Sequence, residues 1–409
     1  MTSLRVRIGI LGLALLAGSA APVSPAAAAA TPSPTVEELR LDQAVPREIL
    51  ERSGFDAVPP RFSRALGSAR SYAQARKVVV RQGAALWQRA VDRAQGRGPA
   101  GGDLSRDDDR PLYWARLAMT REVRTWEPSF GLTETQRAAL LRELERTSRG
   151  QTAVRYPAGD RVKRVLVTGF DPFTLDRDIR ISNPSGASAL ALDGTVIETA
   201  KGPARVETVV FPVRWQDFTD QTVERALRPY LKTVDLFTTV SQGRVGRFDV
   251  ERTNGAWRGG FPDNDNVGVT GAVPVSDPAS QPQWTTTTLP YKAIVDADTG
   301  RFPVYDNTSV TEIPAGGGEP VVRPDGPSPG STARAGGGGN YLSNEIAYRV
   351  TLLRDRLGLH DVLPGGHVHT PVLEFGAGNS TAVTDPEFVR NRLDIIAQVR
   401  AIVSVAVGA

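Results

Sequence analysis

The sequence of 409 residues contains no cysteine and only three histidines. Without cysteine no disulfide can form, so packing alone must hold the fold together. The same absence excludes a lipid anchor attached through a cysteine near the N-terminus. The small number of histidines leaves few candidates for a general base.

No charge of one sign prevails in the chain. It has 49 lysine and arginine residues against 45 aspartate and glutamate residues, which gives a formal net charge of +4. The basic residues are scattered among acidic ones rather than gathered in runs, which argues against a nucleic-acid-binding surface. The apolar share of 40% is enough for a substantial core.

Long apolar runs are also absent, apart from IGILGLALLAG near the N-terminus. Arg5 and Arg7 precede this run, and an alanine-rich stretch that ends at Ala30 follows it. The run is too short to span a bilayer comfortably, and the whole pattern is typical of a secretory signal peptide. We therefore expect cleavage near Ala30 and a secreted, extracellular protein that has no membrane contact after cleavage.

Residues 31–160 show helical patterns and few strand signals. Apolar residues recur at three- and four-residue steps over residues 72–95, which predicts a long amphipathic helix. A second helix is predicted around Trp114, where acidic residues and a proline precede it. Thr133 and Gln136 form a capping-box pair that predicts the start of a third helix. This region has no recognisable catalytic constellation, and we interpret it as a small helical domain or as an elaboration packed on the main domain.

Residues 161–409 show a different pattern, in which short β-branched runs alternate with helical segments. The strand candidates are RVLVTGF, ARVETVVFPV and TVDLFTTVSQG, and a helical pattern separates the last two. Such alternation predicts an α/β fold with a mostly parallel sheet flanked by helices. Near residues 300–340 lies an insert rich in glycine, proline and serine. We expect this insert to be a surface loop that either lies over the active site or is mobile.

Two segments near the C-terminus carry candidate catalytic residues. His367 and His369 are separated by one residue in a short predicted strand, so both side chains point to the same face of the sheet. Ser343 follows a glycine run and lies at or just before the start of a predicted helix. A helix N-terminus would supply amide donors to an oxyanion, whereas the alternative role of Ser343 is that of a simple N-cap. Taken alone, an isolated histidine or serine is more often structural than catalytic.

Four blocks in order along the chain resemble the pyroglutamyl peptidase family, whose members are also called pyrrolidone carboxyl peptidases. The blocks are VLVTGFDPF, DVERTNGAWRGGFPDN, GGGGNYLSNE and GGHVHTP. Members of this family remove an N-terminal pyroglutamate by means of a cysteine, a histidine and a glutamate. The resemblance covers roughly residues 163–409, so it implies a pyrrolidone carboxyl peptidase-like fold there. It also suggests that this part folds without the helical region.

The resemblance assigns roles to individual residues. Ser343 stands where the family has its nucleophilic cysteine, His369 matches the family's histidine, and Glu251 matches the acid that orients it. Phe170 and Phe173 match the aromatic residues that flank the pyroglutamyl ring. The implied substrate is a peptide with an N-terminal pyroglutamate. We expect neither a cofactor nor a metal, and nothing in the sequence indicates the oligomeric state.

Several positions depart from the family pattern. Thr174 and Leu175 replace two glycines, and His367 replaces an apolar residue. The family's arginine, often credited with helping the oxyanion, is best matched by Arg258, although the local spacing differs. These departures imply a pocket of altered shape.

Two functions from different classes remain open. The first is an exported hydrolase that removes N-terminal pyroglutamate, or cleaves a related amide or lactam, with Ser343 as its nucleophile. A hydroxyl is harder to deprotonate than a thiol of pKa about 8.5, although serine resists the oxidation that threatens an exposed thiolate outside the cell. The second is a catalytically silent homologue that acts as a binding or scaffold protein. We favour the hydrolase because Ser343, His369 and Glu251 are residue types that a triad can use.

Overall fold

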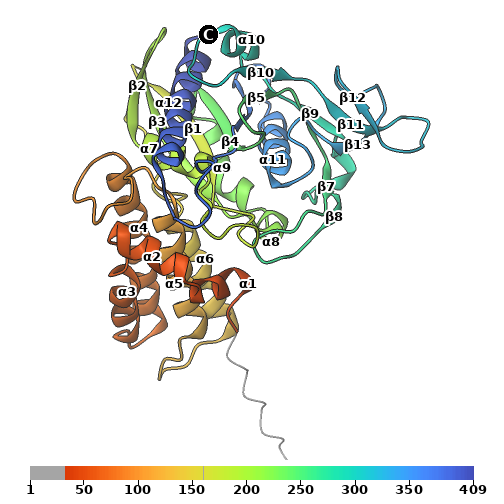
Figure 1. Cartoon of the computed structure of the whole chain (residues 1–409). Helices are drawn as coiled ribbons and strands as arrows, with labels where there is room; N and C mark the ends of the chain where they lie inside the picture. The colour runs from red at the N-terminus through yellow and green to blue at the C-terminus, as the bar shows by residue number, and fades with distance from the viewer. Residues whose placement is uncertain (1–32, 160) are drawn as a thin grey trace, which may run out of the picture.

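The computed structural model describes residues 33–159 and 161–409 (Figure 1). The signal peptide expected in residues 1–30 lies outside the described residues. A group of helices comes first along the chain, and an α/β part with a central sheet follows it. Within the described ranges, no helix is long and apolar enough to cross a membrane.

The N-terminal region is helical, as the sequence predicts. The helix predicted over residues 72–95 is α4, which ends one residue earlier. The predicted capping box at the start of α6 is formed, because Gln136 N donates to Thr133 Oγ1 at 3.2 Å and Thr133 N donates to Gln136 Oε1 at 3.1 Å. The elements are α1 (Val36–Leu39), the 3-10 helix η1 (Arg40–Asp42), α2 (Ala44–Ser53), α3 (Val58–Gly67), α4 (Tyr72–Ala94), α5 (Arg110–Thr125) and α6 (Glu134–Thr147).

Seven strands form the central sheet: β1 (Lys163–Phe170), β2 (Thr195–Thr199), β3 (Gly202–Phe211), β4 (Leu236–Gln242), β5 (Phe248–Glu251), β10 (Val304–Asn307) and β14 (Gly365–Thr370). Their order is β10-β5-β14-β4-β1-β3-β2. The inner strands β14, β4, β1 and β3 run parallel to one another. Antiparallel strands flank them, β5 beside β14 and β2 beside β3.

Helices cover both faces of this sheet, which confirms the predicted fold class (Figure 1). On one face, α12 (Pro386–Gly408) packs against valines of the inner strands, including Val165 and Val240. On the other face, α9 (Thr222–Leu231) and α11 (Leu342–Arg356) pack against Leu166 and Phe237. Neighbouring residues of a strand thus serve opposite faces, as the pleat requires. The other helices of this part are α7 (Pro184–Leu192), α8 (Trp215–Thr219), η2 (Pro278–Ser280) and α10 (Tyr291–Asp296).

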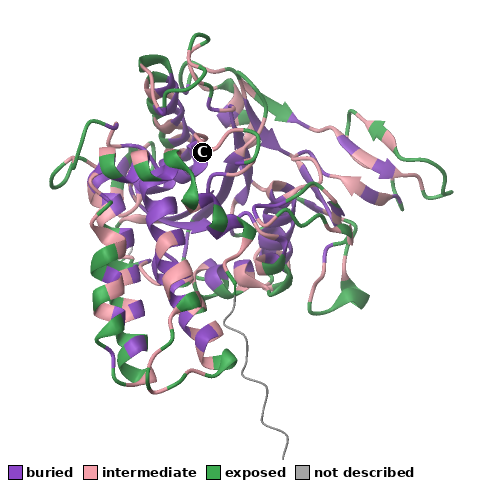
Figure 2. Ribbon diagram, turned by 60° about the horizontal axis from the view of Figure 1, so that its bottom comes forward, coloured by how far each residue is buried: buried purple, intermediate pink, exposed green. Residues whose placement is uncertain are grey.

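The insert near residues 300–340 is not the irregular surface loop that its composition suggested. It contributes β10 to the central sheet, and β11 (Val310–Ile313), β12 (Val321–Arg323) and β13 (Thr332–Ala335) form a separate antiparallel sheet in the order β12-β11-β13. The turn of residues 314–320 holds three glycines and is largely exposed at the end of this sheet (Figure 2). Turn residues therefore dominate the composition of the insert, and the short strands between them give too weak a pattern to be predicted. The remaining strands are β6 (Thr253–Gly255), β7 (Trp257–Gly259), β8 (Thr270–Ala272) and β9 (Trp284–Thr286).

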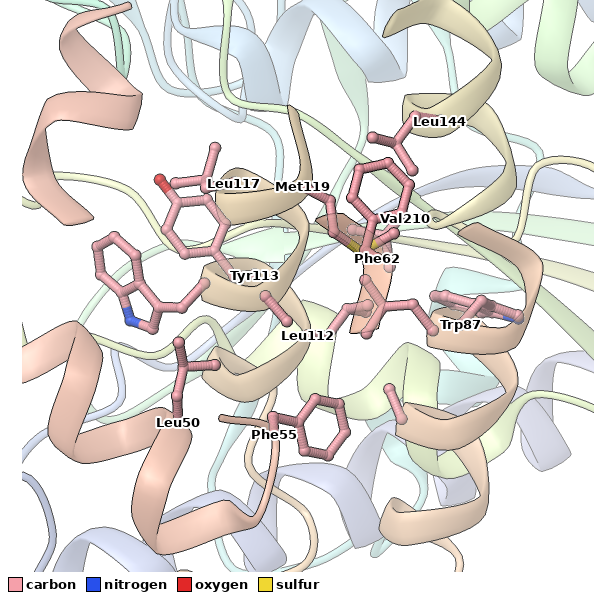
Figure 3. Close-up of a cluster of buried hydrophobic side chains, with 14 of the residues drawn as sticks. Leu50, Phe55, Phe62, Trp87, Leu112, Tyr113, Leu117, Met119, Leu144 and Val210 are labelled. Carbon is pink, nitrogen blue, oxygen red and sulfur yellow. The ribbon is translucent and has the colours of Figure 1, made fainter. Parts of the chain in front are cut away.

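The helical region and the α/β part share one hydrophobic core. Phe62, Trp87 and Leu144 belong to the same buried cluster as Leu190 of α7 and Val210 of β3. Figure 3 shows Val210 lying among the side chains of the helices. The α/β part therefore buries some of its apolar surface against the helices that precede it.

Candidate active site

A cavity of about 340 Å³ opens at the carboxyl ends of the inner strands. Phe170 of β1, Ser241 of β4 and His369 of β14 line one side, and the glycines before α11 line the other. In open α/β sheets, ligands bind outside the carboxyl ends of parallel strands. The cavity is lined by Phe170, Phe173, Asn183, Val213, Ser241, Gln242, Gly243, Arg244, Gly337, Gly338, Gly339, Tyr341, Leu342, Ser343 and His369.

Glu251 and His369 form a hydrogen-bonded pair beside this cavity. Glu251 is fully buried, and its Oε1 lies 2.7 Å from Nδ1 of His369. The second oxygen of Glu251 accepts a hydrogen bond of 2.7 Å from Asn307 Nδ2, which also donates to Gly337 O at 2.9 Å. With Nδ1 held by a carboxyl oxygen, the imidazole proton is fixed there and Nε2 is the nitrogen left for a hydroxyl in the cavity.

Two glycines hold the ring of His369 between backbone segments. A Cβ built at Gly338 would lie 2.8 Å from His369 Cε1, and one built at Gly243 would lie 2.6 Å from His369 Cβ. Real Cβ atoms do not approach other atoms so closely, so only glycine fits at these two positions without a shift. The glycine run before Ser343 thus places backbone directly against the histidine.

Ser343 is the second residue of α11, because Tyr341 occupies the N-cap position. The simple N-cap role considered for Ser343 is therefore excluded. Its hydroxyl donates to Gly338 O at 3.1 Å, and among the described residues no hydrogen bond joins Ser343 Oγ to His369. No side chain of the described part of the chain caps this helix end, so its first amide groups are available to an anion in the cavity. Asn344 fixes the helix start, since its side chain exchanges two hydrogen bonds with the backbone of Gly255.

The two phenylalanines predicted to flank a ring both line the cavity. Phe170 is buried and stacks on Phe218 with ring centres 6.1 Å apart, and Phe173 faces Tyr341 with ring centres 6.2 Å apart. Thr174 follows at φ 58°, in the left-handed region that favours glycine.

Arg258 is the predicted site residue that the structure does not bring to the cavity. It is buried, and its Nε and Nη2 donate to the two carboxyl oxygens of Glu345 at 2.7 and 2.6 Å. Its Nη1 donates to Thr219 Oγ1 at 2.9 Å. All of its nitrogens therefore form hydrogen bonds away from the cavity lining. Glu345, which follows Ser343 closely in α11, binds the guanidinium through both carboxyl oxygens. Its contacts fix α11 to the region around α8.

A second serine and histidine pair, which the sequence did not reveal, lies in the same cavity wall. His367 and His369 share a sheet face, as expected, with ring centres 4.6 Å apart. His367 is fully buried, and its Nε2 lies 2.8 Å from Ser241 Oγ. Burial, and then the charge of His369, lower the pKa of His367 well below its ordinary value of 6.5. His367 therefore stays neutral, and its lowered pKa makes it a weak base.

Sequence reasoning also missed Asn307 and Asn183. Asn307 is the last residue of β10 in the insert, and the composition of the insert did not predict a strand that ends beside Glu251. Asn183 lines the cavity, and its Nδ2 donates to Asp171 O at 2.9 Å. For Ser241 a signal existed, since it lies near the end of the strand candidate TVDLFTTVSQG, and that strand pairs with the strand that carries both histidines. No group of three or more histidines and carboxylates that would hold a metal ion occurs in the described ranges.

Two family models match this chain. The PA0049 N-terminal domain matches residues 18–145, and the PA0049 C-terminal domain matches residues 164–279 and 302–374. The uncharacterized protein PA0049 of Pseudomonas aeruginosa is 34% identical over 495 residues, which covers 91% of this chain and 88% of that protein. The chain belongs to the PA0049 family.

Solved structures similar to this PA0049 family member include pyroglutamyl peptidase I of Bacillus amyloliquefaciens, at 20% identity and a TM-score of 0.41, over 60% of this chain and 98% of that one. A mutant pyrrolidone carboxyl peptidase of Pyrococcus furiosus has 22% identity and a TM-score of 0.40, over 59% and 97% of the two chains. The pyrrolidone carboxyl peptidase of Thermococcus litoralis has 21% identity and a TM-score of 0.40, over 60% and 93%.

Proposed function

We propose that this protein is an exported serine hydrolase that removes N-terminal pyroglutamate from peptides, or cleaves a closely related amide or lactam. The observation that carries the proposal is that Ser343 and His369 line one cavity while buried Glu251 holds Nδ1 of His369. A nucleophile, a base and a group that orients the base are the parts that acyl transfer needs.

In the proposed reaction, Ser343 Oγ attacks the carbonyl carbon that links pyroglutamate to the next residue. His369 Nε2 takes the hydroxyl proton and passes it to the departing amine, while Glu251 keeps Nδ1 protonated and stabilises the imidazolium. The amide groups at the start of α11 stabilise the oxyanion. Water then cleaves the acyl ester, with His369 as base again, and pyroglutamate leaves. Because Ser343 donates to Gly338 O, its hydroxyl must first turn toward His369.

The cavity walls suit a small neutral ring. Phe170 and Phe173 offer aromatic surface, and Ser241 and Gln242 add a few polar groups at the end of β4. A lactam carries no charge and needs such an apolar slot with few hydrogen bonds.

One observation favours the alternative of a catalytically silent binding or scaffold protein. The Ser343 hydroxyl is bonded to a backbone carbonyl rather than to His369. Catalytic hydrogen bonds often tighten only in the complex with substrate, so the hydrolase requires this hydroxyl to turn when substrate binds.

The decisive experiment measures release of a fluorescent amine from a pyroglutamyl amide by the purified protein. We expect activity that falls on the order of 10³-fold or more in Ser343→Ala or His369→Ala, with a large loss in Glu251→Gln and non-additive double variants. A serine-directed phosphonate should label Ser343, and a thiol-alkylating reagent should have no effect because the chain has no cysteine.

Ser343→Cys separates the two functions. Activity in the natural protein that is lost in Ser343→Ala establishes the serine hydrolase. An inactive natural protein that becomes active as Ser343→Cys would mean a usable pocket with a silenced nucleophile, and the binding role would then hold. Absence of activity in both forms would mean that the pocket does not accept pyroglutamyl amides.

Export is a separate part of the proposal. It rests on Arg5, Arg7 and the apolar run that follows them, which predict cleavage near Ala30. N-terminal sequencing of protein from the culture medium or the cell envelope should find a chain that starts near Thr31. An intact Met1 terminus in the cytosolic fraction would contradict export without touching the catalytic proposal.

A further inference from the structure

Ser241 connects the cavity to a buried chain of hydrogen bonds. Thr239 and Ser241 on β4 are the register partners of His367 and His369 on β14. Nδ1 of His367 lies 2.7 Å from Thr239 Oγ1, and Nε2 lies 2.8 Å from Ser241 Oγ. Ser241 lines the cavity, so it is the member of this hydrogen-bonded series that is open to a ligand.

The number of protons on each group determines which atoms donate and which accept along these hydrogen bonds. A neutral imidazole has one N–H and one acceptor nitrogen, and each hydroxyl has one proton to donate. Thr239 Oγ1 donates to Gly366 O at 3.2 Å. Nδ1–H of His367 must then donate to Thr239, and Nε2 must accept from the hydroxyl of Ser241. In the opposite tautomer the Ser241 proton would have no acceptor among the described residues, so the first arrangement satisfies more hydrogen-bonding groups.

We propose that Ser241 is a specificity-determining residue that turns its oxygen lone pairs, and not its proton, toward the ligand. A ligand group at the end of β4 must then carry an N–H or O–H donor, while a carbonyl or ether oxygen there would meet another acceptor. The inference rests on the proposed function in one respect: the donor that we assign to Ser241 is the lactam N–H of the pyroglutamyl ring.

His367 serves this role because it stays neutral. It is fully buried, and the protonated form would lie against His369 with ring centres only 4.6 Å away. Glu251, its register partner on β5, directs its carboxyl to His369 instead. His367 therefore fixes the Ser241 hydroxyl rather than removing its proton, and Ser241 is a fixed acceptor rather than a second nucleophile.

The first test reads the tautomer in the natural protein. The chain has three histidines, so imidazole ¹⁵N shifts from histidine-labelled protein can be assigned with the variants His360→Gln and His369→Ala. We expect His367 to be neutral, with its proton on Nδ1, from pH 5 to 8. A proton on Nε2, or a protonated ring in this range, would overturn the proposal.

The second test measures the hydrogen bond to a ligand. In a Ser343→Ala background, which prevents turnover, calorimetry would compare 5-oxoprolinamide with its N-methyl derivative. Adding Ser241→Ala should weaken binding of 5-oxoprolinamide about three- to tenfold and leave binding of the N-methyl compound unchanged.

The outcomes of the two tests are distinct. Equal weakening of both ligands, or no weakening of either, would contradict an acceptor role for Ser241. If the Ser343→Ala protein binds neither compound, the pyroglutamyl function fails, and the tautomer of His367 alone decides how Ser241 is oriented. If the Ser241→Ala protein does not fold, the tautomer of His367 in the natural protein again decides the orientation of Ser241.

Discussion

At the scale of single residues, two histidines on the same strand differ in the group that contacts Nδ1. Nδ1 of His369 meets the carboxyl of Glu251, whereas Nδ1 of His367 meets the hydroxyl of Thr239. A carboxyl group can stabilise the imidazolium that general-base catalysis produces, and a hydroxyl cannot do so to a similar extent. This difference supports the proposal that His369, and not His367, is the base for Ser343.

Substitution of Asn307 tests how far the position of Glu251 depends on its neighbours. It donates to the free oxygen of Glu251 and to Gly337 O, so it fixes the acid and the glycine run together. Asn307→Ala should lower kcat about tenfold and leave KM nearly unchanged, because no contact with the ring slot is lost. The measurement is the kinetics of pyroglutamyl amide hydrolysis across pH.

Asn307→Asp is the matched variant, since it keeps the shape but places a second carboxyl group beside Glu251. It should lower kcat further and move the acidic limb of the pH profile, as repulsion between neighbouring carboxylates raises their pKa values. Equal kinetics in all three proteins would show that Glu251 holds its position without Asn307.

The same residues show what sequence can and cannot reveal about a site. Ser343, His369 and Glu251 became candidates because each lies in a short block that resembles one family. Asn307 and Ser241 lie outside such blocks, and only tertiary packing brings them to the cavity. Arg258 matched a family residue by type, but type alone did not reveal that Glu345 takes up its charge.

At the scale of elements, the helical region holds one wall of the cavity. Asp109, the N-cap residue of α5, accepts hydrogen bonds from Ser182 Oγ and, at 3.0 Å, from Asn183 N. Asp171 follows Phe170 and pairs with Arg116 and Arg149 of the helical region. The loop between β1 and α7 is thus fixed at both ends by the helices, and it carries Phe173 and Asn183 into the cavity lining.

This contact should depend on pH through Asp109. Burial, and then the charge of Asp108, raise its pKa from 3.8 to about 7. A raised pKa in the folded state means that the stabilising contribution is complete below about pH 4 and is lost as pH rises through 7. The loss should be on the order of 2–4 kcal/mol, because a tenfold change in a protonation equilibrium corresponds to about 1.4 kcal/mol.

Asp109→Asn isolates this effect. The amide keeps an acceptor for Asn183 N and cannot ionise, so the melting temperature of the variant should fall less than that of the natural protein between pH 5 and 8. Asp235→Asn is the control, since Asp235 forms a partly exposed pair with Lys163 and should alter the profile little. Parallel melting curves for Asp109→Asn and the natural protein would contradict the assignment.

At the scale of the whole molecule, periodicity predicted the α/β class and the helical region correctly, because both follow from local alternation of apolar residues. It did not predict the sheet of β11, β12 and β13, whose strands are short and separated by turn residues. Nor did it predict the shared core, since packing between distant elements leaves no local signal. Leu190 and Val210 have the same sequence signature whether they face a helix of this sheet or a helix of the N-terminal region.

The shared core argues against independent folding of residues 161–409, which the family resemblance had suggested. Removing residues 31–155 would expose the apolar surface around Leu190 and Val210. It would also leave Arg392 of α12, which is fully buried, without Asp107, to which its Nε donates at 2.5 Å. The truncated chain thus loses both apolar burial and an ion pair, so its stability should fall.

We therefore expect the truncated chain to be insoluble, or soluble without a near-ultraviolet circular dichroism signal. Co-expression of residues 31–155 as a separate chain should restore a soluble complex, because the lost contacts are non-covalent. The natural protein without residues 1–30 is the matched control and should unfold cooperatively. A truncated chain that also unfolds cooperatively on its own would mean that the helices are a separable domain. The loop between β1 and α7 would then keep its conformation without contacts from the helices.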